Sequence, residues 1–320
     1  MVDSSVAIRF DGVVKRFAGA NRPAVDGVSL DIPREAFVVV VGPSGCGKTT
    51  LMRTVNRLVT PSSGSVSVNG TDVAAADPIR LRRGIGYVIQ NTGLFGHMTV
   101  AENVAIVPGL LGWDAPRIDA RVDELLELVH LPAHEYRSRR PRELSGGQQQ
   151  RVGLARALAA DPAILLMDEP FGAVDAIERA HLQDEIAALQ SRLHKTVVFV
   201  THDVDEAFRL ADIIVIMRDG RVEQSAAPAE VLARPASPFV VDLVGARDVV
   251  RRMRALRAIA AIDPQTAGRP GLPAIADQAT LGDALAALLD GADMLEVRDP
   301  GGAPLGVVTV ASVLAAARRV

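Results

Sequence analysis

The chain is poor in cysteine, carries little net charge and has no long apolar run. Its single cysteine cannot form a disulfide within the chain, which fits a reducing compartment. The longest apolar runs, such as 37–41 and 213–217, have only the length of strands, whereas a membrane-spanning helix needs ~20 residues. The N-terminus shows no basic segment followed by an apolar run, so no signal peptide is expected. We therefore expect a soluble or peripheral protein.

The net charge and the length of the chain bear on its binding partners and on its number of domains. The 35 basic and 38 acidic residues give a net charge of −3, so nothing in the overall charge favours nucleic-acid binding. The 320 residues suffice for one large or two modest domains, and the 48% of hydrophobic residues can fill a sizeable core.

Short apolar runs alternate with longer helical patterns along the first two thirds of the chain. The runs at 38–41, 164–167, 197–201 and 213–217 are apolar apart from the threonine at 201, which is typical of parallel strands covered on both faces. Residues 66–69 alternate between apolar and polar side chains and are bounded by Gly64 and Gly70, which predicts a hairpin strand. Residues from about 99 to 160 are mostly helical in pattern, and 117–129 is amphipathic. We predict an α/β fold with a helical insertion.

A glycine-rich segment follows the first of these strands and precedes a helix predicted at 49–58. It fits the pattern G-x-x-x-x-G-K-[ST] with Gly42, Pro43, Ser44, Gly45, Cys46, Gly47, Lys48 and Thr49, and Thr50 comes next. Glycines let backbone N–H groups wrap around phosphates, and the helix points its positive end at them. Lys48 is expected to bridge the β and γ phosphates and Thr49 to ligate Mg²⁺. A plain strand-to-helix turn would not explain that lysine and threonine in register.

Two carboxylates, Asp168 and Glu169, follow the apolar run at 164–167. Because α/β sheets bind ligands at the carboxyl ends of their strands, Asp168 is placed to reach the Mg²⁺ shell. Glu169 is then placed to polarise a water for attack on the γ phosphate. An acidic junction between strand and loop is common by itself, but the phosphate-binding loop in the same chain favours the functional interpretation.

A serine and two glycines begin another helical pattern, which runs to about residue 160. The segment consists of Leu144, Ser145, Gly146, Gly147 and Gln148. Exposed backbone donors at a helix start form a second anion-binding site. A simple helix cap would explain Ser145 but not the whole segment. A second site of this kind is useful if the nucleotide of another subunit lies against it.

In combination, these motifs resemble those of ABC transporter ATPases over residues 6–235. The segment 42–49 matches the Walker A motif, 164–169 the Walker B motif and 144–148 the ABC signature, in the family's order. The resemblance implies a P-loop NTPase fold of the ABC type with a helical subdomain, ATP and Mg²⁺ as cofactors, and a head-to-tail homodimer. Each ATP would lie between Lys48 and Thr49 of one copy and Ser145, Gly147 and Gln148 of the other.

The same resemblance implies four further site residues. Gln90 matches the Q-loop glutamine, which joins the Mg²⁺ shell and links to the membrane subunit. Asp175 matches the D-loop aspartate, although the loop departs from the commoner Ser-Ala-Leu form. His202 matches the switch histidine that contacts the γ phosphate. Phe17 matches the aromatic residue that stacks on adenine, with Phe10 as its rival.

Segments 86–99, 102–108 and 171–175 resemble the ATPases of bacterial glycine betaine and related quaternary-amine importers. The end of the chain has the pattern of a strand at 294–297, a turn, a second strand and a helix at 310–318, and it resembles one CBS motif, an α+β unit found as a tail on these importers. A single copy leaves adenine-nucleotide binding by the tail open. The resemblance implies membrane permease subunits, an extracytoplasmic substrate-binding protein and a peripheral position on the cytoplasmic face of the bacterial inner membrane.

We predict three parts: an ABC ATPase domain at 1–238 with a helical subdomain at about 91–160, a basic helix and linker at 239–273, and the CBS-like unit at 274–320. The middle part is rich in arginine. Its arginines are interpreted either as a solvated helix face or as a patch attracted to an anionic leaflet, at about 1 kcal/mol per residue. They are Arg247, Arg251, Arg252, Arg254 and Arg257.

Other ABC functions stay open as alternatives. The ATPase of an importer for another small solute, or a non-transport ABC ATPase, would share every nucleotide motif. A DNA-repair ABC ATPase would carry a long heptad insertion, and a translation-type protein would repeat the whole motif set; the sequence has neither.

Overall fold

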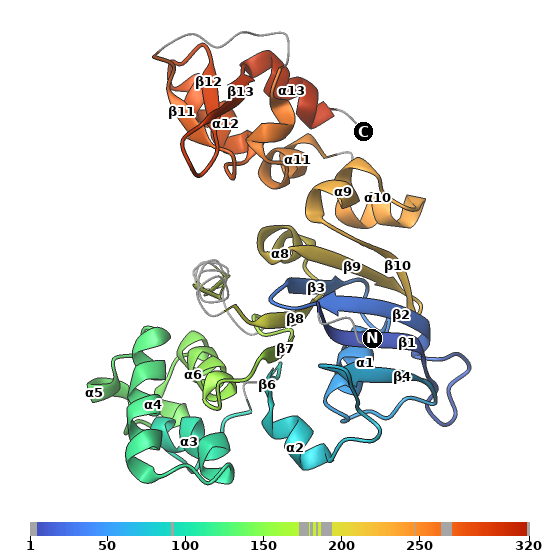
Figure 1. Cartoon of the computed structure of the whole chain (residues 1–320), viewed down its shortest axis with the longest axis vertical. Coiled ribbons are helices and arrows are strands. Elements are labelled where there is room, and N and C mark those ends of the chain that lie inside the picture. The colour runs from blue at the N-terminus through green and yellow to red at the C-terminus, as the bar shows by residue number, and fades with distance from the viewer. Residues whose placement is uncertain are drawn as a thin grey trace. The chain divides into compact units, whose positions relative to one another are not determined.

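The computed structural model describes residues 5–90, 93–172, 179, 182–183, 185–186, 194–246, 248–263 and 271–318. The chain forms two compact units, Met1–Val222 and Glu223–Val320 (Figure 1). This division falls inside strand β10 (Arg221–Ala226), earlier in the chain than the boundary expected at 238. The domain boundaries expected at 238 and 273 from the sequence stay predictions.

A six-stranded sheet of order β10-β9-β3-β8-β7-β6 is central to the first unit. Its parallel strands are β3 (Phe37–Val41), β6 (Ile85–Val88), β7 (Ile164–Asp168), β8 (Thr196–Thr201) and β9 (Ile213–Arg218). Every residue of β3, β7 and β8 is buried, as a strand covered on both faces requires. The four continuous strands predicted from the sequence are confirmed. Because they run parallel, the carboxyl ends of β3, β7 and β8 lie at the same end of the sheet.

A second, antiparallel sheet has the order β2-β1-β4-β5. It consists of β1 (Val6–Lys15), β2 (Val25–Pro33), β4 (Ser63–Val68) and β5 (Thr71–Asp72). The pairing of β4 with β5 confirms the hairpin strand predicted near 66–69. Apolar residues of this sheet share one core with helix α1 (Lys48–Val55) and with β3, including Phe10, Leu51 and Val38.

Helices α3 (Val100–Leu110), α4 (Ala115–Leu128), α5 (Ala133–Tyr136) and α6 (Gly146–Leu158) form the helical insertion. Figure 1 shows them, in green, gathered beside β6, the last strand of the large sheet. Helix α4 buries Val122, Leu125 and Leu126, which confirms the amphipathic pattern predicted at 117–129. The unit also contains α2 (Pro78–Arg83) and α8 (Val204–Leu210).

The second unit begins with α9 (Pro228–Ala233), α10 (Pro238–Val244) and α11 (Val249–Ala255). A three-stranded sheet of order β11-β12-β13 follows, formed by Ala274–Ala276, Leu295–Arg298 and Pro304–Val308. Helices α12 (Leu281–Leu289) and α13 (Val310–Arg318) accompany it. The strand, turn, strand and helix predicted near the C-terminus are therefore present. None of the described helices is long and apolar enough to cross a bilayer.

The arginine-rich stretch is not the single basic helix that the sequence predicted. Helix α10 stops at Gly245, whose φ of 59° is left-handed, and α11 starts after Asp248 and has ended before Arg257. Arg252 is only 2% exposed, and its guanidinium donates to the carbonyl oxygens of Leu232 at 3.1 Å and Ala246 at 3.3 Å. Because Arg252 is buried, neither the solvated helix face nor the patch attracted to an anionic leaflet describes this residue. Residue 247 and residues 264–270 lie outside the described part.

Candidate nucleotide-binding and hydrolysis site

The phosphate loop (residues 42–49) joins β3 to α1, as predicted. Gly47 has a φ of 107°, and a Cβ there would lie 2.1 Å from the carbonyl oxygen of Ala24. A Cβ at Gly42 would lie 2.2 Å from the carbonyl oxygen of Met217. Only glycine fits at either point. Gly47 starts α1 without a side-chain cap, so the first N–H groups of the helix are available to an anion held by the loop.

Lys48 lies under this loop and is 5% exposed. Its ammonium donates to the carbonyl oxygens of Gly42 at 2.7 Å and Pro43 at 3.1 Å. The sulfur of Cys46 lies 3.9 Å from the same nitrogen. Burial raises the pKa of the Cys46 thiol, which keeps it protonated at neutral pH and makes it a poor nucleophile. The remaining loop residues Pro43, Ser44 and Gly45 are exposed, and Thr49 and Thr50 are half-buried.

Asp168 ends β7 and faces the first turn of α1. The hydroxyl of Thr49 donates to one of its carboxylate oxygens at 2.7 Å. The other oxygen accepts from Arg53 at 3.2 Å and lies 3.5 Å from the Tyr87 hydroxyl. The sequence did not predict these two partners, because neither belongs to a nucleotide motif. Hydroxyl and carboxylate oxygens this close together are the hard donors that Mg²⁺ prefers, so this donor set fits the cation.

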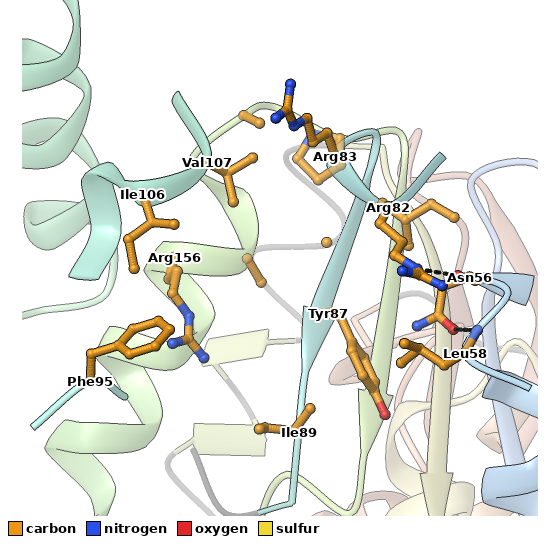
Figure 2. Close-up of a pocket in the computed structure, with 15 residues that line it drawn as sticks. Asn56, Leu58, Arg82, Arg83, Tyr87, Ile89, Phe95, Ile106, Val107 and Arg156 are labelled. Atoms are coloured by element: carbon orange, nitrogen blue, oxygen red, sulfur yellow. Dashed lines mark hydrogen bonds between the residues drawn. The ribbon is translucent and has the colours of Figure 1, made fainter. Parts of the chain in front are cut away.

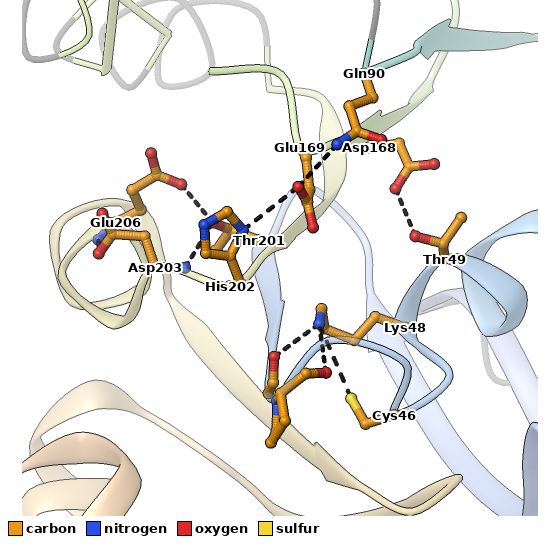
Figure 3. A network of polar contacts seen from close by, with 12 residues as sticks. Cys46, Lys48, Thr49, Gln90, Asp168, Glu169, Thr201, His202, Asp203 and Glu206 are labelled. Atoms are coloured by element: carbon orange, nitrogen blue, oxygen red, sulfur yellow. Dashed lines mark hydrogen bonds and ion pairs between the residues drawn. The ribbon is translucent and has the colours of Figure 1, made fainter. Parts of the chain in front are cut away.

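Glu169 turns out of the sheet immediately after Asp168. Its φ of 45° is uncommon for a residue with a side chain, and its N–H donates to the carbonyl oxygen of Val200 at 2.9 Å. One carboxylate oxygen accepts from the Gln90 amide at 3.1 Å and lies 3.4 Å from Nδ1 of His202 (Figure 3). Gln90 follows β6, Glu169 follows β7 and His202 follows β8. These three predicted site residues therefore meet at the carboxylate of Glu169.

Ser145 caps α6. Its hydroxyl oxygen accepts from the N–H of Gln148 at 3.2 Å, and the Gln148 side chain accepts from the N–H of Ser145 at 3.0 Å. The Gln148 amide also donates to the Tyr136 hydroxyl at 3.2 Å. Ser145 and Gly146 are exposed, whereas Gly147 is buried. Within the described residues these side-chain hydrogen bonds stay in the helical insertion, and none reaches the phosphate loop.

The two candidates for adenine stacking differ in burial. Phe17 is 46% exposed, and the ammonium of Lys15 lies 5.0 Å from its ring centroid. Phe10 is 3% exposed and belongs to the core. Only the ring of Phe17 offers a face to a base. Asp175 lies outside the described residues.

A cavity of about 320 Å³ adjoins the Q-loop segment (Figure 2). Ile89, which precedes Gln90, lines it together with Phe95, Ile106 and Val107. Arg156 from α6 also lines it and donates to the carbonyl oxygen of Gly93 at 2.7 Å. The cavity is mainly apolar, although Asn56, Arg82 and Arg83 also line it.

Comparisons with known proteins identify the class. The profile of the ABC transporter family matches residues 25–172. The osmoprotectant import ATP-binding protein OsmV of Salmonella typhimurium is 45% identical over 308 residues, which cover 94% of this chain and 78% of that protein. The chain therefore belongs to the ABC transporter family, as one of its ATP-binding proteins.

Two further likenesses refine this assignment. The carnitine transport ATP-binding protein OpuCA of Listeria monocytogenes is 51% identical over 238 residues; the match covers 74% of this chain and 59% of that protein. A solved dimeric structure of the ATP-binding cassette MJ0796, in a post-hydrolysis state with ADP and Pi, is 32% identical with a TM-score of 0.62. It covers 69% of this chain and 98% of the other.

Proposed function

We propose that this chain is the ATP-hydrolysing subunit of an ABC importer for a quaternary-amine osmoprotectant such as glycine betaine, carnitine or choline. The observation that carries the transport class is the 45% identity to an osmoprotectant import protein across 94% of the chain. The similarity to a carnitine transport protein supports the same substrate class. An importer for another small solute is the alternative.

Hydrolysis is assigned to the carboxylate of Glu169. Gln90 and His202 hold it at one oxygen, so it is placed to orient a water toward the γ phosphate, which His202 contacts. Lys48 exchanges its loop carbonyl partners for phosphate oxygens, and Phe17 stacks on adenine. Thr49, Asp168 and Gln90 would hold Mg²⁺, which when bound neutralises phosphate charge.

The second half of each site comes from another copy of the chain. Ser145, Gly146, Gly147 and Gln148 of that copy present the start of α6 to the γ phosphate, and Asp175, which matches the D-loop aspartate, is assigned to the same nucleotide site. The exposure of Ser145 and Gly146 supports this arrangement. The dimeric state of the MJ0796 cassette supports it as well.

The permease subunits dock at the apolar cavity beside Gln90, and this places the chain on the cytoplasmic face of the membrane. Movement of α3 and α6 relative to Gln90 then couples the nucleotide state to the permease. The C-terminal unit is assigned to a CBS-like fold, which the order of β11, α12, β12, β13 and α13 supports. An extracytoplasmic binding protein delivers the solute.

Uptake in cells without their own osmoprotectant transporters tests the proposal. The chain is expressed with its permease and binding protein, and accumulation of labelled glycine betaine, carnitine and choline is measured. We expect uptake by the wild type and none by Lys48→Ala. Lys195→Ala is the matched control and should transport normally, because this lysine, paired with Asp161 at 2.8 Å, precedes β8 at the end opposite His202. Uptake of a different solute class would establish the alternative importer.

A further inference from the structure

Hydrogen bonds to buried side chains hold the loop that carries His202, although the His202 side chain itself is 59% exposed. The hydroxyl of Thr201 donates to a carboxylate oxygen of Glu206 at 2.6 Å and accepts from the N–H of Asp203 at 3.0 Å (Figure 3). Thr201 is 2% exposed and Glu206 5%. The residues on both sides of His202 are therefore tied to one buried carboxylate.

The second oxygen of Glu206 is also occupied. It accepts from the side-chain amide of Gln183 at 3.2 Å, and the oxygen of that amide accepts from Arg209 at 3.2 Å. Arg209 thus fixes which end of Gln183 faces Glu206. Glu206 meets a donor at each oxygen, so an acceptor is required at both positions, and a side-chain amide would set an N–H against one of the donors.

Burying the Glu206 carboxylate costs free energy of folding. Burial raises the pKa of the Glu206 carboxyl, because a charged group loses hydration inside the protein. Both oxygens need good partners to compensate for that loss. Gln183 lies between Asp175 and β8 in the sequence, so the same carboxylate connects the Gln183 side chain to the His202 loop.

We propose that Glu206 is a positioning residue for His202: through Thr201 and Asp203 it holds the backbone that keeps the imidazole next to Glu169. The inference rests on the proposed ATP hydrolysis. Loss of this hold leaves the phosphate loop intact, so it weakens turnover and not nucleotide affinity. A displacement of about 1 Å at a reacting group lowers a rate by about 100-fold, which sets the scale of the effect.

Strand β8 offers a matched pair of variants for the test. Thr201→Val removes the hydroxyl that contacts Asp203 and Glu206 at one end. Thr196→Val makes the same change at the other end, where the hydroxyl accepts from the N–H of Glu35 at 2.8 Å. Both threonines are almost fully buried, so both variants should lose similar thermal stability.

Steady-state ATPase kinetics and equilibrium ATP binding are measured on the full chain for both variants, with Glu206→Gln and Thr201→Ser. We expect kcat to fall about 10- to 100-fold in Thr201→Val and Glu206→Gln with unchanged ATP affinity. Thr201→Ser should restore kcat because it keeps the hydroxyl, and Thr196→Val should keep it throughout. Equal kcat in the two valine variants, or a loss of ATP affinity that accounts for the slower turnover, would overturn the proposal. A wild-type chain without ATPase activity would instead refute the proposed function, and this inference with it.

Discussion

Replacing the buried Arg252 by alanine should destabilise the second unit strongly. Its guanidinium donates to the carbonyl oxygen of Leu232 near the end of α9 and to that of Ala246 just after α10. Hydrogen bonds from a charged donor contribute about 1.5–3 kcal/mol each. Truncation also leaves both carbonyls without this donor. We therefore expect the free energy of unfolding around α9 and α11 to fall by about 3–5 kcal/mol.

Native-state hydrogen exchange read by mass spectrometry measures this effect locally. Amides of α9, α10 and α11 should lose protection in Arg252→Ala, while those of the central sheet should not change. Arg254→Ala is the control, because that side chain is exposed on the same helix, and its effect should stay within about 0.5 kcal/mol. Equal protection in the two variants would refute the structural role of Arg252 and would mean that it contributes no more to stability than an exposed arginine.

Three further predictions concern the nucleotide site. Glu169→Gln should bind ATP normally, lose about 10²–10⁴-fold in kcat and accumulate an ATP-dependent dimer visible by light scattering; near-normal turnover would remove Glu169 from its role. A mixed dimer with Lys48→Ala in one chain and Ser145→Arg in the other should retain one working site, and two sites that close normally would exclude shared sites. Iodoacetamide should label Cys46 slowly in the folded chain. Because the thiolate reacts and burial raises the pKa of this thiol, the rate should still climb with pH beyond the ordinary cysteine pKa of about 8.5. A plateau near that value in the mass-spectrometric time course would contradict the burial argument.

The sequence predicts the nucleotide half of the fold well because its signals are local. A strand buried on both faces needs a continuous apolar run, and β3, β7, β8 and β9 each contain one, with polar residues only at the ends of β7, β8 and β9. The phosphate loop is equally local, since its turn, lysine and helix start are consecutive residues. The choice between Phe17 and Phe10 needed the burial of each ring, although alternation along β1 already points Phe10 inward beside Ile8.

The features that the sequence did not predict involve contacts between residues that are distant in sequence. Nothing near Arg252 indicates that its guanidinium meets the end of α9, so its charge predicted exposure. Arg53, Tyr87 and Glu206 escaped notice for the same reason, because each acts on a residue of another element. One signal was available for Glu206: a glutamate on the buried face of a short helix requires donors that the sequence alone does not identify.

The cap at the start of α6 also restricts which residues natural variation or design can place there. Serine, threonine, aspartate and asparagine all cap helices well, so helix stability alone would let them interchange at position 145. Ser145 caps as an acceptor, which leaves its hydroxyl hydrogen uncommitted by the cap. In the proposed dimer an aspartate would preserve the helix but present a negative charge to the γ phosphate, and the stability of the variant would not reveal this repulsion. A screen that scores folding alone would therefore accept a variant whose dimer, in the proposed arrangement, cannot close on ATP.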